Sequence, residues 1–470
     1  MMADIPCRVV VIGGGLAGLS AAESLAQAGV TGVRILEASH RCGGRMKTIR
    51  FGESIVELGA NWIHGATLSN SVFTLAAQNN LLNPYVLLDR MEGYCYTSAG
   101  HVIDPHLANR VWTIYQALEQ DLGGLSSQTK DTPGIPLESW YKNKFENALA
   151  LFKTQEQEDA RAVMNCLLNL IRFHNGGFLE DTDTHLIAQY EELPGGEVKL
   201  PRGCASILDA VLNTLPKGSV QYNTEVTNVH LDTSGPTPKV EVRCRNGSQM
   251  MAEHVIVTCS LGFLKRHHHA LFSPPLSSQK VHAIENIGFG IVSKIFLYYK
   301  IPFWVQGRGG IKLCWQEHES RPLGKEEWYK KIFSFDEVLN NPGVLVAWLS
   351  GDEAAYMERL PLQEVANVCS NILKTFLGNP GLPSPTRVCR SEWSDNPYIC
   401  GSYSYPTTSS PHSLVPHLME PVCSSDQVPR ILFAGEATHP TYFSTMHGAR
   451  SSGLREANRI ISLYNMRPKL

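Results

Sequence analysis

The sequence has few charged residues and no long run of one sign. Only 18% of its 470 residues are Asp, Glu, Lys or Arg, fewer than the roughly 25% of typical soluble domains. Its 41 basic and 44 acidic residues leave a formal net charge of −3. A protein that grips nucleic acid by its phosphates needs a basic field, so this balance argues against that class. A charged pocket of local extent is compatible with it.

Disulfide frameworks and membrane spans are also missing from the sequence. The twelve cysteines are scattered singly from Cys7 to Cys423 with no C-x-x-C pair, which favours free thiols in a reducing compartment. No apolar run approaches the ~18 residues of a membrane span. The amino terminus lacks the basic and apolar segments of a secretory leader. We therefore expect a soluble protein, and its length and 43% apolar content predict a large core.

A glycine-rich turn follows the first predicted strand. The turn lies between a predicted strand over 9–12 and a predicted helix over 16–28, and a second predicted strand over 33–36 ends at Glu37. This is the βαβ context of a dinucleotide-binding fingerprint, in which the glycines let a pyrophosphate approach the helix N-terminus and the acid binds ribose hydroxyls. Its three glycines are Gly13, Gly15 and Gly18.

Two later segments repeat this pattern of glycines beside charged residues. A second glycine turn lies just downstream, with Arg41, Gly44 and Arg45, and it allows another backbone segment to approach the same anionic ligand. Near the carboxyl end, a predicted strand over 430–434 passes into Gly435 and Glu436, and a predicted helix over 447–464 follows. The cofactor domain is therefore predicted to be discontinuous and built from both ends of the chain.

These patterns predict an α/β fold of two interleaved domains. A further predicted strand over 255–258 adds to the dinucleotide-binding unit, and predicted helices over 158–175 and 362–377 lie outside it. We assign a Rossmann-like dinucleotide-binding domain, the cofactor domain, and an α+β substrate domain. The first comprises residues 1–70, 200–265 and 425–470, and the second comprises residues 71–199 and 266–424.

Seven stretches, in order from near residue 9 to near residue 463, carry a resemblance to a known family: VVVIGGGLAGLSAA, LEASHRCGGRMKT, VELGANWIHG, HVIVTCSLGFLK, IGFGIVSKIFLYYKIPFW, EWSDNPYICGSYSY and ILFAGEATHPTYFSTMHGA. Together they resemble the flavin-containing amine oxidases, and within them the animal polyamine oxidases, with the N1-acetylpolyamine oxidases first and the spermine oxidases as the alternative. The resemblance implies the amine-oxidase fold.

The resemblance implies FAD as the cofactor, bound without a covalent link. Monoamine oxidases carry a flavin-linking cysteine where this chain has Ser402, and Cys400 lies two residues too early. The positions that the resemblance assigns to FAD surround its ribose, pyrophosphate, adenine and isoalloxazine: Gly13, Gly15, Gly18, Glu37, Arg41, Gly44, Arg45, Gly59, Ala60, Trp62, Val226, Trp393, Gly435, Glu436 and Thr445.

Lys294 opens the apolar run 294–299, so it lies either at a solvated strand end or in a buried site. The resemblance implies the second placement and a catalytic role, in which the lysine holds a water against the flavin. It also implies that His64 lies near the substrate nitrogen. Tyr403 corresponds to one wall of the family's aromatic cage, which makes Lys294, His64 and Tyr403 the predicted catalytic residues.

Substrate recognition is assigned to polar residues around that cage. Where monoamine oxidases and plant polyamine oxidases have a tyrosine, this chain has Thr445 after Ser444, and the resemblance implies that these hydroxyls, with His64 and Tyr403, bind nitrogens spread along a chain. Glu191 and Glu192 are the candidates for an acidic mouth that attracts a polycation; the alternative is a solvated turn.

The run His267-His268-His269 is interpreted as a solvated loop, because consecutive side chains point in different directions and no cysteine or carboxylate partner is near. We therefore predict no metal site.

The resemblance implies oxidation of the secondary amine of N1-acetylspermine or N1-acetylspermidine, or of spermine, by hydride transfer to FAD. The products are an aminoaldehyde, a shorter polyamine and H2O2. The alternatives are a monoamine oxidase, which should have the flavin-linking cysteine and a membrane-anchoring tail; a histone-demethylase relative, which needs an inserted tower; and a non-catalytic flavin-binding scaffold.

The expected partners are the polyamine substrate and O2, with no nucleic acid and no membrane, and we expect a monomer. The last three residues, Pro468-Lys469-Leu470, resemble the peroxisomal address S-K-L. This ending predicts a peroxisomal protein that binds an import receptor, with the cytoplasm as the alternative.

Overall fold

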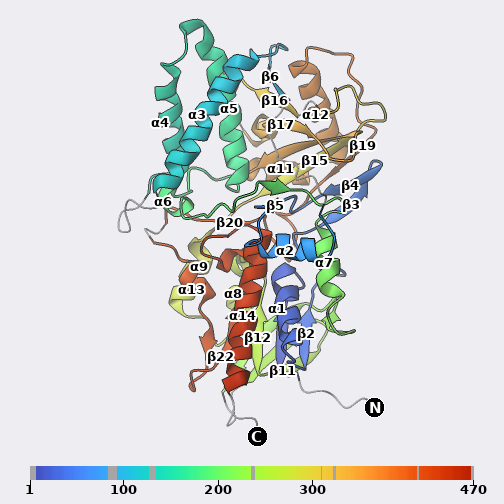
Figure 1. Ribbon diagram of the computed structural model, residues 1–470, viewed down its shortest axis with the longest axis vertical. Helices are drawn as coiled ribbons and strands as arrows, with labels where there is room; N and C mark the ends of the chain where they lie inside the picture. Colours follow the sequence, from blue (N-terminus) through green and yellow to red (C-terminus); the bar gives the residue numbers. More distant parts are fainter. Residues whose placement is uncertain are drawn as a thin grey trace.

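The computed structural model describes residues 7–82, 93–125, 134–233, 239–307, 310–320, 324–409 and 412–466. Figure 1 shows two regions stacked along the long axis of the molecule, a lower one that contains α1 (Leu16–Gln27) and α14 (Met446–Met466) and an upper one that contains α3 (Pro105–Gly124) and α12 (Leu362–Phe376). The chain crosses between them several times. The mixed α/β fold that the sequence predicts is confirmed.

A six-stranded sheet forms the centre of the lower region. Its order is β21-β22-β12-β1-β2-β8, and all neighbours are parallel apart from β21 and β22. Every residue of β1, β12 and β22 is buried, as expected for a parallel sheet covered on both faces. The strands are β1 (Val9–Ile12), β2 (Val33–Leu36), β8 (Val220–Gln221), β12 (His254–Val257), β21 (Val422–Cys423) and β22 (Pro429–Phe433). The strands predicted over 9–12, 33–36, 255–258 and 430–434 are thereby confirmed to within one residue.

Helix α1 from one end of the chain packs against α14 from the other. Gly453 allows this close packing, because a Cβ atom there would lie 2.1 Å from the backbone oxygen of Ala17. Gly18 instead lets α1 pack against the turn before it, because a Cβ atom there would lie 2.1 Å from the backbone oxygen of Gly13. The helices predicted over 16–28 and 447–464 are therefore confirmed, and they close the sheet from both ends of the sequence.

A second layer completes the lower region. The four-stranded sheet β11-β10-β9-β13 and the helices around it share cores with the parallel sheet. These elements are β9 (Val226–Asp232), β10 (Lys239–Cys244), β11 (Gln249–Ala252), β13 (Phe272–Ser273), α2 (Ser71–Gln78), α7 (Ala205–Leu212), α8 (Leu261–Leu271), α9 (Ser278–Asn286) and α13 (Val415–Met419). The predicted limits assign α2, α9 and α13 to the other domain. Because they pack on this core, we favour wider sequence limits for the cofactor domain. The division of the chain into two domains stays a prediction.

The upper region has a second six-stranded sheet, in the order β19-β15-β18-β17-β16-β6. One hydrophobic cluster joins it to α11 and α12, and another joins it to the bundle of α3, α4 and α5. Its strands are β6 (Gly93–Thr97), β15 (Val292–Tyr298), β16 (Gly310–Cys314), β17 (Ser334–Glu337), β18 (Val344–Ser350) and β19 (Arg387–Arg390); the other helices are α4 (Leu137–Leu149), α5 (Gln157–His174) and α11 (Asp352–Arg359). The helices predicted over 158–175 and 362–377 are confirmed as α5 and α12.

Short ladders lie where the two regions meet (Figure 1). The chain pairs there as β3 with β4, β5 with β7, and β14 with β20. Their bounds are β3 (Thr48–Phe51), β4 (Ser54–Glu57), β5 (Ile63–His64), β7 (Glu197–Val198), β14 (Gly288–Phe289) and β20 (Ser404–Tyr405). The β5–β7 and β14–β20 ladders hold residues of distant sequence position against one another, and they thereby set the geometry of the space between the regions.

The prediction for the histidine run is wrong. His267, His268 and His269 lie in α8, which begins at the N-cap Ser260, whose side chain accepts a hydrogen bond from the backbone of Phe263. A carboxylate is also near, because Glu285 of α9 faces the helix. A consecutive run of histidines has no apolar periodicity of its own, so the helix is set by its cap and by packing.

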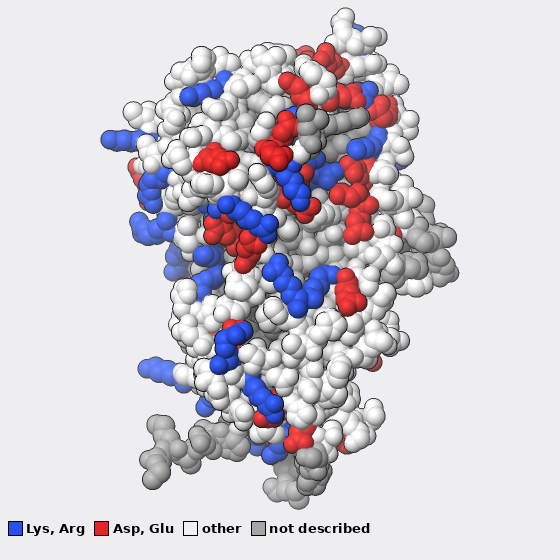
Figure 2. Space-filling view, turned by 180° about the vertical axis from the view of Figure 1, so that it is seen from behind, with Lys and Arg blue, Asp and Glu red and all other residues white. Residues whose placement is uncertain are grey.

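The expected free thiols are confirmed, since all twelve cysteines are unpaired. Among the described residues, no helix is long and apolar enough to cross a membrane. Figure 2 shows Lys and Arg side chains interspersed with Asp and Glu over the face seen from behind. The carboxyl-terminal Pro468-Lys469-Leu470 lies outside the described residues.

We expect Gly453→Ala to destabilise the protein by about 1–3 kcal/mol, because the added Cβ meets backbone that only a shift of a whole helix can relieve. The matched control is Gly124→Ala in α3, where a Cβ would have no atom within 4 Å. Helix propensity alone then predicts a gain of about 0.5–1 kcal/mol. Urea unfolding measures both changes; effects of the same sign would contradict the close packing of α1 and α14.

Candidate functional site

One large cavity runs between the two regions, with a volume of about 2030 Å³. This exceeds the ~300–1,000 Å³ of a typical small-molecule site, so it accommodates a large cofactor together with a substrate. Of the residues predicted for the site, all but two lie in its wall. The two exceptions are Gly18, which packs under the first turn of α1, and Glu191.

The lower part of the cavity is a cradle of backbone. A Cβ on Gly15 would meet no atom within 4 Å, and one on Gly44 would meet only the Cα of Gly15, at 3.9 Å. The two glycine turns therefore face each other across open space at the start of α1, where backbone N–H groups and the helix dipole favour an anion. Glu37 is buried beside this cradle, and its carboxylate accepts hydrogen bonds from the N–H groups of Gly14, at 2.7 Å, and Ser39, at 2.8 Å.

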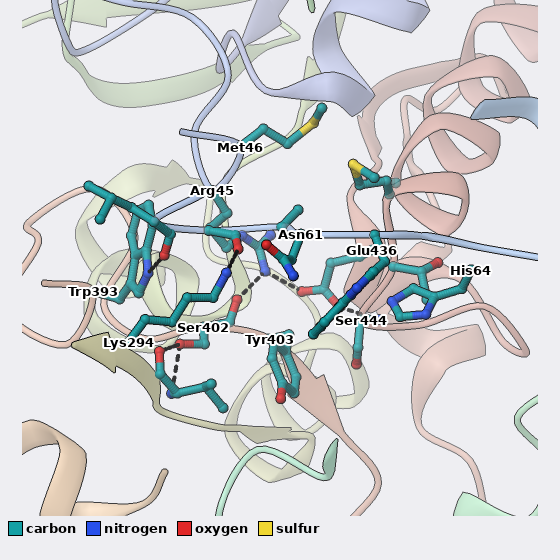
Figure 3. Close-up of a pocket in the computed structure, with 18 of the residues that line it drawn as sticks. Arg45, Met46, Asn61, His64, Lys294, Trp393, Ser402, Tyr403, Glu436 and Ser444 are labelled. Atoms are coloured by element: carbon teal, nitrogen blue, oxygen red, sulfur yellow. Dashed lines mark hydrogen bonds and ion pairs between the residues drawn. The ribbon is translucent and has the colours of Figure 1, made fainter. Parts of the chain in front are cut away.

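Arg45 and Glu436 form an ion pair in the middle of the cavity wall, in which the side chain of Glu436 is buried and that of Arg45 is 26% exposed (Figure 3). Arg45 Nη1 lies 2.7 Å from Glu436 Oε1 and donates a second hydrogen bond, of 2.8 Å, to the backbone oxygen of Ser402. The other carboxylate oxygen of Glu436 accepts from Ser404 Oγ at 2.6 Å and from the N–H of Ser444 at 2.8 Å. Four segments of the chain thus meet at one charge pair.

Lys294 lies in the third position of β15, only 5% exposed. The structure therefore selects the buried alternative over the solvated strand end. Its Nζ donates hydrogen bonds to the backbone oxygens of Glu57, at 2.8 Å, and Gly59, at 2.6 Å. Burial lowers the pKa of Lys294 to about 7, although the charge of Glu57 opposes the shift. Beside it, the indole of Trp393 donates a hydrogen bond of 3.0 Å to the oxygen of Leu58.

A second tryptophan, Trp348, lines this part of the cavity, and no local pattern in the sequence singles it out. Its ring stacks on Trp62 with centroids 5.5 Å apart, and Lys294 Nζ lies 5.0 Å from its centroid. Its Nε1 donates to Asp336 Oδ2 at 2.7 Å, and Asp336 also forms an ion pair of 2.7 Å with the buried Lys312. Trp348 is the cross-strand neighbour of Lys294 in the sheet, a register that only the folded chain reveals.

His64 is oriented by Glu197, another residue that the sequence analysis missed. Their backbones pair in the β5–β7 ladder, and His64 Nδ1 lies 2.7 Å from Glu197 Oε1. Burial opposes ionisation of Glu197, but the hydrogen bond and charge of His64 lower its pKa. The carboxylate therefore accepts from Nδ1–H and leaves Nε2 as the ring nitrogen free of this contact. His174 of α5 also lines the cavity, and burial lowers its pKa.

The cage position has one aromatic wall. Tyr403 is held by a hydrogen bond from its hydroxyl to the backbone oxygen of Phe173. Opposite this aromatic position, the Ser444 hydroxyl donates to the oxygen of Ser404, and the Thr445 hydroxyl donates to that of Tyr442 at 2.7 Å. Both hydroxyl hydrogens are thus donated to backbone oxygens. These residues can therefore contact a ligand only as hydrogen-bond acceptors, through their oxygen lone pairs.

Acidic side chains gather at one end of the cavity. Glu192 lines it, together with Glu119 of α3, which accepts a hydrogen bond from the hydroxyl of Tyr141. Burial, and to a lesser extent the charge of Glu192, raises the pKa of Glu119. Glu191 instead faces the hydroxyl of Tyr442 at 3.2 Å and lies outside the wall. Of the two predicted glutamates, therefore, one faces the cavity.

The residues present fit FAD. The glycine cradle leaves room for a pyrophosphate at the start of α1. Higher in the cavity, the indole Nε1 of Trp62 is buried and has no hydrogen-bond partner among the described residues. Since buried donors are nearly always satisfied, this one points to a bound acceptor. Flat apolar surfaces beside it, from Trp62 and Trp393, suit an isoalloxazine ring.

The two buried lysines of the cavity wall give a pH-dependent test. Because the pKa of Lys294 is about 7 in the fold and about 10.5 in the unfolded chain, the unfolded state binds more protons between these values, and stability rises with pH there. Lys294→Met removes this dependence. Relative to the parent, its free energy of unfolding should therefore fall by up to about 1.4 kcal/mol for each unit by which the pH rises across that window. Urea unfolding at several pH values measures it.

The matched control is Lys312→Met. Burial alone lowers the pKa of Lys312, but Asp336 reverses the shift and raises it above 10.5. The contribution of Lys312 to stability is therefore fully present below that pH, and the difference between this variant and the parent should stay constant from pH 7 to pH 10. If the difference in stability between Lys294→Met and the parent does not change from pH 7 to pH 10, the lowered pKa of Lys294 is contradicted.

Comparison with known proteins agrees with this geometry. Residues 16–461 match the family model described as flavin containing amine oxidoreductase. The chain is 34% identical to human peroxisomal N(1)-acetyl-spermine/spermidine oxidase, covering 97% of this chain and 95% of the relative, and 33% identical to the bovine protein of that name over the same shares. Rice polyamine oxidase 1 is 29% identical, over 99% of this chain and 98% of its own length.

A solved structure of putrescine oxidase bound to putrescine has a TM-score of 0.73 with this chain at 18% identity, covering 97% of this chain and 99% of that one. It shows that the two chains share a fold. The family match over nearly the whole chain carries the assignment: this protein belongs to the flavin-containing amine oxidoreductases and is an amine oxidase with FAD as its cofactor.

Proposed function

We propose that this amine oxidase acts on polyamines, and that it oxidises the secondary amine of N1-acetylspermine or N1-acetylspermidine, with spermine as the second candidate. The observation that carries the proposal is the lining of the cavity, in which one continuous wall includes the dinucleotide cradle, Lys294 and Tyr403, and the neighbouring acids Glu119 and Glu192. The names of the human, bovine and rice relatives support it. Products are an aminoaldehyde, a shorter polyamine and H2O2.

When bound, FAD accepts a hydride from the carbon next to the reacting nitrogen and passes the electrons to O2. The protein must present that nitrogen without its proton, although an amine of pKa ~10 is neutral in only about one molecule per thousand at pH 7. His64 meets this need in the proposal, since Glu197 holds its Nδ1–H and leaves Nε2 as an acceptor for an amine N–H.

Lys294 is proposed to act beside the reacting centre. The backbone oxygens of Glu57 and Gly59 accept two of its hydrogens, so the position of Nζ is fixed. One hydrogen-bonding position on Nζ stays available. A pKa of about 7 lets it be charged or neutral under mild conditions. That property suits a group that orders a water or supplies a proton as negative charge develops on reduced oxygen.

The preference for a long amine over a monoamine rests on the cage. Only Tyr403 provides an aromatic wall, while the opposite positions, Ser444 and Thr445, offer hydroxyl oxygens. An ammonium at the far end of the substrate would then lie near Glu192 and Glu119. We propose this acidic end as the subsite that selects a charged terminus.

We also propose that FAD is held without a covalent bond. Ser402 stands at the position of the flavin-linking cysteine, and its hydroxyl is occupied by hydrogen bonds with the backbone of Val292, at 2.8 and 3.0 Å. Acid denaturation should release the yellow chromophore into the supernatant. Colour that stays on the precipitated chain would overturn this part of the proposal.

A peroxisomal location is proposed from the Pro468-Lys469-Leu470 ending, which would bind an import receptor, and from the names of the human and bovine relatives. The cytoplasm is the alternative. We further propose that the protein is a monomer.

The substrate is tested by anaerobic flavin reduction, because this reaction reports oxidation of the amine without the step with O2. We expect N1-acetylspermine, N1-acetylspermidine and spermine to bleach the flavin, and the fastest of the three to identify the substrate. Benzylamine serves as the monoamine control and should react slowly or not at all. Equal or faster reduction by benzylamine would sink the polyamine assignment, and no bleaching by any amine would indicate a flavin-binding scaffold.

The acidic subsite is tested separately with adjacent glutamates. Glu192→Gln should raise the KM of the best polyamine about fivefold, equal to about 1 kcal/mol for one exposed charge pair, with kcat little changed. Glu191→Gln is the matched control, because its carboxylate lies outside the cavity wall beside Tyr442. Indistinguishable KM values for the two variants would remove Glu192 from the subsite.

A further inference from the structure

Outside the cavity, two imidazoles and one carboxylate converge on the surface of the lower region. His268 and His269 lie in the last turn of α8, and Glu285 lies near the end of α9. One ligand atom from each lies within 4.8 Å of the other two. From this convergence we propose that His268, His269 and Glu285 bind a divalent ion of the Zn²⁺ type.

The distances are close to those of a zinc site. Both Zn–N and Zn–O bonds are about 2.0–2.2 Å, so neighbouring ligands of a tetrahedral ion lie about 3.3–3.5 Å apart. Here Glu285 Oε1 lies 3.7 Å from His268 Nε2 and 4.0 Å from His269 Nε2. The rings of the two histidines lie side by side, with centroids 3.7 Å apart. Small rotations about side-chain bonds bring all three to bonding distance.

His268 supplies an independent indication of a ligand. Its side chain is only 2% exposed, and its Nε2 has no hydrogen-bond partner among the described residues. That atom faces Glu285, which is too distant for a hydrogen bond. Buried polar atoms are nearly always hydrogen-bonded, so an ion bound to Nε2 accounts for an atom that has no hydrogen bond and only a 3.7 Å ion pair with Glu285.

The other two ligands leave the site open to solvent. The side chains of His269 and Glu285 are 76% and 51% exposed, so an ion reaches them without any movement of the backbone. The nearby Lys265 donates its hydrogen bond, of 2.6 Å, to the backbone oxygen of Glu285 and not to the carboxylate. Three protein ligands leave a fourth position for water, and imidazole with carboxylate favours Zn²⁺ over Mg²⁺ or Ca²⁺.

The ion would join α8 to α9. Helix α8 follows β12 through residues 258–260, which line the cofactor end of the cavity. The proposed ion therefore fastens the helix that leaves the cradle to the next helix of the same core. Its role is structural, and it does not depend on which amine the enzyme oxidises.

The FAD-loaded full-length protein, treated with chelator and dialysed, is titrated with Zn²⁺ by calorimetry. We expect one Zn²⁺ per chain, and at least a tenfold weaker affinity in His269→Ala and in Glu285→Gln. Both positions are exposed, so these variants should keep the fold. His267→Ala is the matched control, because its ring packs on Phe263, with centroids 4.5 Å apart, and belongs to no ligand set. It should bind Zn²⁺ like the parent.

A thermal melt and a Co²⁺ spectrum complete the test. Zn²⁺ should raise the Tm of the parent and of His267→Ala but not that of the other two variants. Co²⁺ at the site should give visible d–d bands without a thiolate charge-transfer band. No saturable binding, equal affinity in all variants, or a thiolate band that assigns the ion to cysteine would each overturn the proposal.

Discussion

The half-buried ion pair between Arg45 and Glu436 is the interaction on which the arrangement of the site depends. It joins the loop after the second strand to the turn before the last helix, 391 residues away. Through its remaining hydrogen bonds it also fixes the segments of Ser402 and Ser444. Removal of Arg45 would leave the buried carboxylate of Glu436 without its ionic partner, which is the costly way to break such a pair. The pair thus holds the segment of the cavity wall that contains Arg45 against the segments of the cage, so the two parts of the site are positioned together.

The lower half of the cavity is made of backbone, and the upper half is made of side chains. In the cradle, Gly15 and Gly44 contribute empty space and N–H groups. In the upper half, Lys294 and Trp348 form a stack that Asp336 anchors. The division follows from what each half must hold, since phosphates bind to amide groups and helix termini, whereas a flat ring and an amine need aromatic faces and fixed proton donors or acceptors.

Local patterns in the sequence predicted the elements, but not the partners that they bring together. The strands over 9–12 and 33–36 and the helix after Gly15 follow from β-branched runs and glycine spacing, and they are confirmed. The partners of predicted residues were missed, because Glu197 meets His64 through a two-residue ladder and Trp348 meets Lys294 through sheet register. The histidine helix was missed for a related reason: its signal is the cap Ser260, whereas the run itself suggests a polar loop.

The twelve free thiols bear on the durability of an enzyme whose proposed reaction releases H2O2. Peroxide attacks the thiolate and not the thiol, so a sulfur is protected when its proton is held tightly. Cys259 lies in the cavity wall, and burial raises its pKa to about 12. At neutral pH this sulfur is almost wholly protonated. The packing that buries Cys259 therefore also protects this sulfur of the cavity wall from the product of the proposed reaction.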